Sequence, residues 1–270
     1  MGSRRPCANG CASASRQIAR AVEILLPKAG ESAPPGRRAR GRPGLGNYWQ
    51  LPAAAPIRGM PHAFEFCVPK AAKAVPAGPD WIHEIKYDGY RARLVRDGDR
   101  VRLESKAGLD WTWRFPFIVQ TARQLRPARL AIDGEIVVLD ARGISDFDAL
   151  HSGKHNAEAQ LYAFDLVGLA GDGLRQMPLF ERKVELGKLL RGRPEGIFVA
   201  PFEPGAIGPD LFAAACEMGL EGLVPSIGNG AIDRTHATGS RLRIARIRPC
   251  RAGLNEAGPR QDSQRGPSMR

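Results

Sequence analysis

The sequence has few of the features that mark membrane proteins or proteins held together by disulfides. No apolar run among the 270 residues approaches the length that crosses a membrane, so a transmembrane helix is not expected. The N-terminal arginines are not followed by a continuous apolar stretch, which argues against a secretory signal. The five cysteines are odd in number and scattered, which argues against a disulfide framework and for a reducing cytoplasm.

Acidic residues are also scarce relative to basic ones, and the formal net charge is +12. Residues 1–60 hold 10 Lys or Arg and 2 acidic residues, residues 61–240 hold 22 and 24, and residues 241–270 hold 8 and 2. The positive excess therefore lies at the two ends, where it suits non-specific binding of a nucleic-acid backbone. An equally weighted alternative is disordered Arg-rich sequence without a binding role, because Ser32–Gly46 shows no base-reading pattern.

Hydrophobic periodicity indicates an α+β domain between tails at 1–60 and 251–270 that are expected to be disordered. Strands are expected at residues 80–86, 90–96, 100–105, 129–139, 160–168, 221–225 and 241–248. Helices are expected at residues 114–126, 178–190 and 209–218, with a short one at 15–26. The 43% hydrophobic content is enough for a real core.

The most informative segment is Trp81–Arg91, in which Lys86 ends an apolar stretch and precedes a turn-prone Tyr-Asp-Gly. The pattern predicts a strand, a tight bend at Asp88–Gly89, and a second strand. A lysine at a strand end beside a glycine is well placed to meet a phosphate. Apolar residues behind it would favour the neutral, nucleophilic amine. The alternative is a solvated lysine in a hairpin.

This segment resembles motif I, Lys-x-Asp-Gly-x-Arg, of the covalent nucleotidyltransferases. Its flanks look most like the bacterial ATP-dependent DNA ligases, especially the ligase domain of the end-joining enzymes. Four more segments resemble family motifs in the same order: Glu104–Thr112 follows motif I, and Ala131–Val137, Leu161–Leu166 and Leu220–Val224 resemble motifs III, IIIa and IV. One match is weak, but five in order are a strong signal. The resemblance covers roughly residues 62–250, which are expected to form the adenylation domain.

The resemblance implies an ATP-grasp-like adenylation domain of antiparallel sheets with inserted helices. It also implies that Lys86 attacks ATP, carries AMP, and passes it to the 5′-phosphate of nicked or broken double-stranded DNA, with Mg²⁺ as cofactor. The implied roles are Glu84 and Arg91 bordering the nucleotide, Lys106 contacting ribose or phosphate, Glu135 binding ribose or metal, Phe164 stacking on adenine, Glu221 binding Mg²⁺, and Arg246 and Arg248 contacting phosphates. Singly, Phe164 could equally be a core residue and Glu135 a turn residue.

Two departures from the family pattern lie near the C-terminus. Pro225 and Ser226 stand where motif IV ends in Ser-Lys, and arginines stand for the two lysines of motif V. The family's OB-fold domain follows motif V, whereas here only 251–270 follow, so a separate protein could supply it. The sequence therefore predicts weak adenylation and very poor sealing. The alternatives are an inactive ligase relic that binds nucleic acid and a related enzyme acting on RNA.

Overall fold

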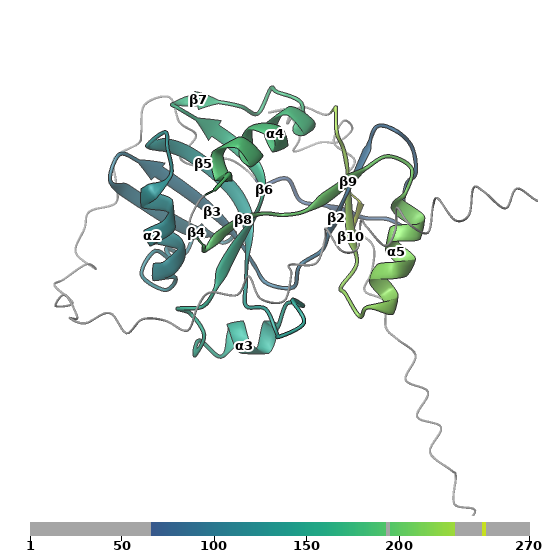
Figure 1. Cartoon of the computed structure of the whole chain (residues 1–270), viewed down its shortest axis with the longest axis horizontal. Helices are drawn as coiled ribbons and strands as arrows, with labels where there is room; N and C mark the ends of the chain where they lie inside the picture. Colours follow the sequence, from purple (N-terminus) through teal and green to yellow (C-terminus); the bar gives the residue numbers. More distant parts are fainter. Residues whose placement is uncertain (1–65, 193–194, 230–244, 247–270) are drawn as a thin grey trace, which may run out of the picture.

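The computed structural model describes residues 66–192, 195–229 and 245–246 (Figure 1). The helices are α2 (Pro116–Gln124), α3 (Phe147–His151), α4 (Leu179–Leu190) and α5 (Gly208–Glu217). The strands are β1 (Lys70–Ala71), β2 (Trp81–Ile85), β3 (Tyr90–Asp97), β4 (Arg100–Ser105), β5 (Arg129–Val137), β6 (Gln160–Leu169), β7 (Asp172–Gly173), β8 (Ile197–Val199), β9 (Phe202–Pro204), β10 (Leu223–Ile227) and β11 (Ala245–Arg246).

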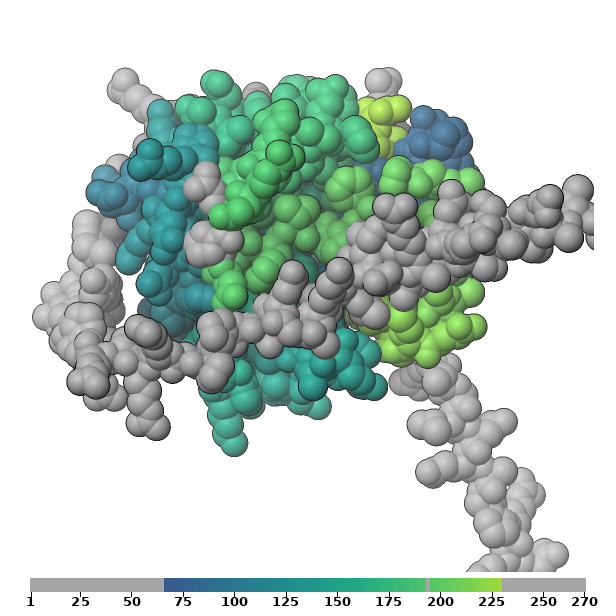
Figure 2. Space-filling view, viewed as in Figure 1, coloured from purple at the N-terminus to yellow at the C-terminus, as the bar shows by residue number. Residues whose placement is uncertain are grey.

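The larger sheet has the order β4-β3-β5-β6-β7, with β8 added in parallel beside β6. Side chains alternate between its two faces, as the period of a strand requires. One face buries Leu94, Ile132 and Leu161 against α2 and α4 in a single hydrophobic core. In the space-filling view, side chains of these two helices lie over this face (Figure 2). The opposite face carries two smaller clusters, one around Val95 and Val167 and one around Val137 and Tyr162.

The smaller sheet has the order β10-β2-β9 and packs against α5, around Ile85, Leu211 and Leu223. β2 therefore pairs with β10 and β9, whereas β3 pairs with β4 and β5. The bend at Asp88–Gly89 does not close a hairpin. It carries the chain from β2 in the smaller sheet to β3 in the larger one (Figure 1), and Lys86 directly follows β2.

The expected α+β fold with antiparallel sheets and inserted helices is confirmed. β11 lies inside the expected strand at 241–248, while the tails and the helix at 15–26 fall outside the described residues. Cys67 is free and Cys216 is disulfide-bonded, a bond that the scattered cysteines did not predict. Within the described part of the chain, no helix has both the length and the apolar character needed to span a bilayer.

Candidate active site

A cavity of about 560 Å³ lies where the two sheets meet, which is a typical size for a small-molecule site. Both sheets and α4 contribute to its lining. The structure brings together here seven of the residues singled out from the sequence: Glu84, Lys86, Arg91, Lys106, Glu135, Phe164 and Glu221. Arg246 is in β11, where only its backbone is described, and Arg248 lies outside the described residues.

Lys86 is fixed through both its backbone and its side chain. Its amide N–H donates to the Gly222 carbonyl oxygen at 2.9 Å, and its Nζ forms an ion pair with Glu221 Oε1. Each of the two side chains is 17% exposed, so the pair faces the cavity without being sealed from solvent. The nucleophile candidate is thus held between β2 and β10, with a carboxylate at its amine.

Gly89 explains why the segment after Lys86 can lie close against β5. A Cβ at this position would stand 2.2 Å from the Ile136 carbonyl oxygen and 2.9 Å from Val137 Cγ1. Only a residue without a side chain fits against the strand. The Tyr-Asp-Gly sequence thereby lets Lys86 line the same cavity as Glu135, which belongs to β5.

Glu135 is a half-buried carboxyl on the cavity wall, opposite Arg91 in the strand pairing. Burial raises its pKa to about 8, and the nearby charges of Arg91 and Lys86 oppose this only in part. Gly134, beside it, has no room for a side chain, because a Cβ would stand 2.8 Å from the Tyr162 carbonyl oxygen. Close packing of β5 on β6 therefore requires the glycine of the Asp-Gly-Glu sequence.

A β-bulge in β6 brings two consecutive residues to the cavity. Asp133 pairs with Asp165 and Gly134 pairs with Ala163, so Phe164 has no partner on β5. Phe164 and Asp165 both line the cavity, although neighbouring strand residues normally face opposite ways. The bulge thus places an aromatic ring and a carboxylate side by side.

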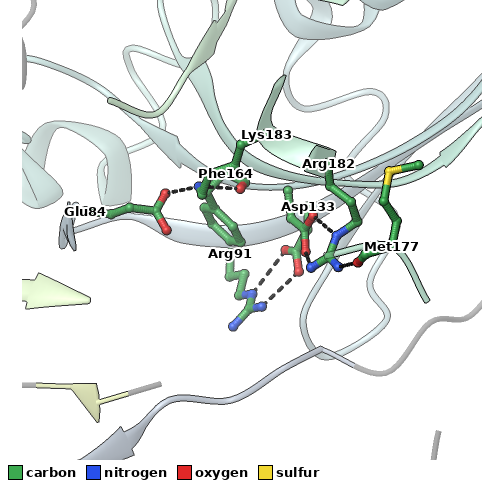
Figure 3. A network of polar contacts seen from close by, with 8 residues as sticks. Glu84, Arg91, Asp133, Phe164, Met177, Arg182 and Lys183 are labelled. Carbon is green, nitrogen blue, oxygen red and sulfur yellow. Dashed lines mark hydrogen bonds and ion pairs between the residues drawn. The ribbon is translucent and has the colours of Figure 1, made fainter. Parts of the chain in front are cut away.

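Paired charges surround Phe164 (Figure 3). Arg91 binds Asp133 through two hydrogen bonds, Nε to Oδ1 at 3.1 Å and Nη2 to Oδ2 at 2.8 Å. Arg182 binds Asp165 in the same manner, at 2.7 and 2.9 Å. The Arg91 guanidinium carbon also lies 5.1 Å from the centroid of the Phe164 ring. The ion pair with Asp133 therefore holds Arg91 against the ring.

Residues 64–226 match the family model of the ATP dependent DNA ligase domain, which is more than half of the chain. The chain belongs to this family. The resemblance read from the five motifs is thereby confirmed. The boundaries at 62 and 250 and the roles of individual residues remain predictions.

The ligase relatives include end-joining proteins. The chain is 35% identical over 205 residues to the multifunctional non-homologous end joining protein LigD of Pseudomonas aeruginosa, covering 74% of this chain and 23% of the relative. DNA ligase C of Mycobacterium tuberculosis is 35% identical over 154 residues, 53% of this chain and 40% of the relative. The chain thus spans less than half the length of these two relatives.

Solved ligase structures share the fold. The ligase domain of M. tuberculosis LigD superposes with a TM-score of 0.52 at 26% identity, over 61% of this chain and 56% of that one. A mycobacterial DNA ligase D complexed with ATP gives the same TM-score at 25% identity, over 70% and 59%. These structures support the adenylation-domain architecture expected from the sequence.

The sequence reading of this ligase domain missed the charged residues on α4. Arg182 and Lys183 lie three and four residues after Leu179, and Leu186 follows at helical spacing, so both occupy the core-facing stripe. Charged residues at core-facing positions of a helix are a sequence signal that could have been used to identify these two residues. Burial raises the pKa of the Glu84 carboxyl, and its partner Lys183 is the main opposing charge.

The described residues contain no group of three or more His, Cys, Asp or Glu side chains suited to a metal ion. Glu135 and Glu221 do line the same cavity. Mg²⁺ is usually bound through one or two carboxylates together with substrate phosphates. The carboxylates present therefore fit a Mg²⁺ shared with a nucleotide, and they do not fit an all-protein metal cage.

Proposed function

We propose that this chain catalyses the adenylation step of an ATP-dependent DNA ligase. The amine of Lys86 attacks the α-phosphate of ATP, a nitrogen–phosphorus bond forms, and the bond to pyrophosphate breaks. The AMP held on Lys86 then passes to the 5′-phosphate at a break in DNA. The observation that carries the proposal is that Lys86, Glu135, Phe164 and Glu221 line one cavity at the junction of the sheets.

The side chains around Lys86 suit this reaction. An ammonium cannot attack, so Lys86 must first lose a proton, and its ion pair with Glu221 holds the amine at the cavity. Phe164 offers a flat surface on which adenine would stack. Glu84 and Arg91 would border the nucleotide, and the exposed Lys106 would reach its ribose or phosphates from the rim.

Glu135 and Glu221 would hold Mg²⁺, which when bound would offset charge on the phosphates. The raised pKa of Glu135 supports this assignment. Burial disfavours its negative charge, and a bound cation would restore that charge. Arg246 and Arg248 would bind phosphates, as the family pattern implies.

A second candidate function is nucleic-acid binding by a ligase that has lost its chemistry. Its support is Ser226, which lines the cavity in place of the family's lysine. β10 is the edge strand of its sheet, so Pro225 is tolerated there and Ser226 keeps its place opposite Ile82. The cavity therefore lacks one cation that would face the phosphates. We infer from this that adenylation is slowed rather than abolished.

Broken or nicked double-stranded DNA is the proposed substrate of the second step. The arginine-rich ends would contribute non-specific backbone contacts. A separate protein supplying end-binding or OB-fold function is a further proposal, and it rests on the family resemblance alone.

Incubation with α-labelled ATP and Mg²⁺, followed by a denaturing gel, tests the function. Label should stay on the unmodified protein and disappear with Lys86→Ala. Lys70→Ala, which removes an exposed lysine of β1, should keep it. Absence of label on the unmodified protein would favour the inactive relic. Label that survives Lys86→Ala would show that another residue is the nucleophile.

A further inference from the structure

Lys183 is the buried cation that joins the two sheets beneath the cavity (Figure 3). Its side chain is fully buried, and its Nζ donates to Glu84 Oε1 at 2.7 Å and to the Phe164 carbonyl oxygen at 2.8 Å. The same Nζ lies 4.9 Å from the centroid of the Phe202 ring. Lysine carries three N–H donors, and these three neighbours account for all of them.

The three contacts come from both sheets. Glu84 and Phe202 are paired residues of β2 and β9 in the smaller sheet, whereas Phe164 belongs to β6 in the larger one. β2 leads directly to Lys86, two residues beyond Glu84. A single ammonium thus connects the strand that carries the nucleophile candidate with the strand that carries the aromatic ring.

The Phe164 carbonyl has a particular need for this contact. The β-bulge leaves Phe164 outside the residue pairing of β5 and β6, and Lys183 donates to its carbonyl oxygen instead. A bulge without such a contact would cost an unmade hydrogen bond and would leave the ring less well placed. Lys183 therefore fixes the backbone from which Phe164 reaches the cavity.

Burying an ammonium costs several kcal/mol before compensation, so this lysine is a poor choice for stability alone. An apolar residue at this point of the helix stripe would pack with less cost. Lys183 holds the side chain of Glu84 on one sheet and the backbone carbonyl of Phe164 on the other, and both residues line the cavity. We propose that Lys183 is a positioning residue that sets the base-binding side of the nucleotide cavity by clamping Glu84 and Phe164 together.

This inference rests on the proposed function, because it assumes that the cavity takes a nucleotide with its base on Phe164. A positioning role predicts different effects on binding of the base and binding of the phosphates, whereas a general structural role does not. Loss of Lys183 should weaken the base side of the site and leave the phosphate side intact, because Lys183 belongs to α4, whereas Lys106 follows β4, Glu135 lies in β5 and Glu221 precedes β10.

The test compares Lys183→Met with Lys188→Met, which makes the same change on the exposed face of α4. Lys188 is 60% exposed and bonds only within its own helix, to Glu185. Each full-length protein is treated with pyrophosphate to remove bound AMP. Calorimetry then measures binding of α,β-methylene ATP, which Lys86 cannot cleave, and of inorganic tripolyphosphate, which has no base.

We expect Lys183→Met to weaken binding of the ATP analogue about tenfold or more and to change tripolyphosphate binding less than twofold. Lys188→Met should change neither. Unaltered binding of the analogue by Lys183→Met would overturn the inference. Equal weakening of both ligands would also overturn it, because that result describes a general structural defect.

Lys183→Met leaves Glu84 buried without its partner, so thermal unfolding must show that the variant folds. If it does not, Glu84→Gln with Lys183→Met removes the stranded charge, and it should still bind the analogue more weakly than Glu84→Gln alone. A double variant equal to Glu84→Gln would contradict the clamp at Phe164. Self-adenylation of the unmodified protein is measured in parallel. Its absence would refute the proposed function, whereas the binding comparison separately decides the role of Lys183.

Discussion

Replacing Gly89 by alanine should displace the segment that carries Lys86. The added Cβ would stand 2.2 Å from the Ile136 carbonyl oxygen, 2.9 Å from Val137 Cγ1 and 3.1 Å from Glu135 Cγ. The first of these atoms is backbone in the middle of a sheet, so it cannot move without breaking strand pairing. Overpacking of this kind typically costs about 1–3 kcal/mol. For a domain of this size that corresponds to a fall of roughly 2–12 °C in Tm.

The effect on activity should exceed the effect on stability. The bend must move away from β5 by about an ångström, and it carries Lys86 away from Glu135 with it. A displacement of that size can cost about 100-fold in rate when the reacting groups must be aligned. The adenylation rate at saturating ATP and the Tm are therefore measured on the same Gly89→Ala preparation.

Gly187→Ala is the matched control, because no atom lies within 4 Å of a Cβ at that position and it is inside α4. Alanine favours a helix interior over glycine by roughly 0.5–1 kcal/mol, so this variant should be as stable as the original or more so. Its adenylation rate should not change. A Gly89→Ala protein with the Tm and rate of the original would refute the steric reasoning for the bend.

Three further predictions concern pH, the cavity and the ends of the chain. Burial raises the pKa of Glu135 to about 8, so the fold favours its protonated form. Without Mg²⁺, the contribution of this carboxyl to the free energy of unfolding is complete below its unfolded pKa and is lost as pH rises through about 8. Glu135→Gln should therefore flatten the pH dependence of the unfolding free energy over this range, as measured by denaturant titration. An unchanged slope would contradict the raised pKa of Glu135. Pro225→Ser combined with Ser226→Lys should raise the adenylation rate by about tenfold or more, because it returns a cation to the cavity lining; an equal or lower rate would show that this cation is not limiting. Removing residues 1–60 and 241–270 should abolish most of the affinity for nicked DNA and most of its salt dependence, and a truncated protein that binds as tightly as the full chain would disprove the charge argument.

The elements with strong local patterns could be predicted from the sequence. The strand expected at 100–105 has those bounds in the structure, and the helix expected at 178–190 begins one residue later. Their patterns are local, because alternation and helical spacing are visible within one segment. β1, β7, β8 and β9 were missed, since strands of two or three residues are defined by a distant partner rather than by their own sequence.

The sequence predicted which residues form the site, but not how the strands and helices are arranged around it. Motif resemblance identified Lys86 and Glu135, and both residues line the same cavity. It could not show that β2 and β3 belong to different sheets, because the bend between them has the same composition as a hairpin turn. Nor could it find the Asp165–Arg182 pair, since that contact depends on a bulge and on the docking of α4.

The most direct test of the account is the position of the covalent AMP. The unmodified protein is incubated with ATP and Mg²⁺, digested under conditions that preserve a phosphoramidate, and mapped by mass spectrometry. The account predicts a single adenylated peptide, modified at Lys86 and returned to the free lysine by pyrophosphate. AMP on any other residue, or its absence from every peptide, would contradict the proposal that this cavity makes lysyl-AMP.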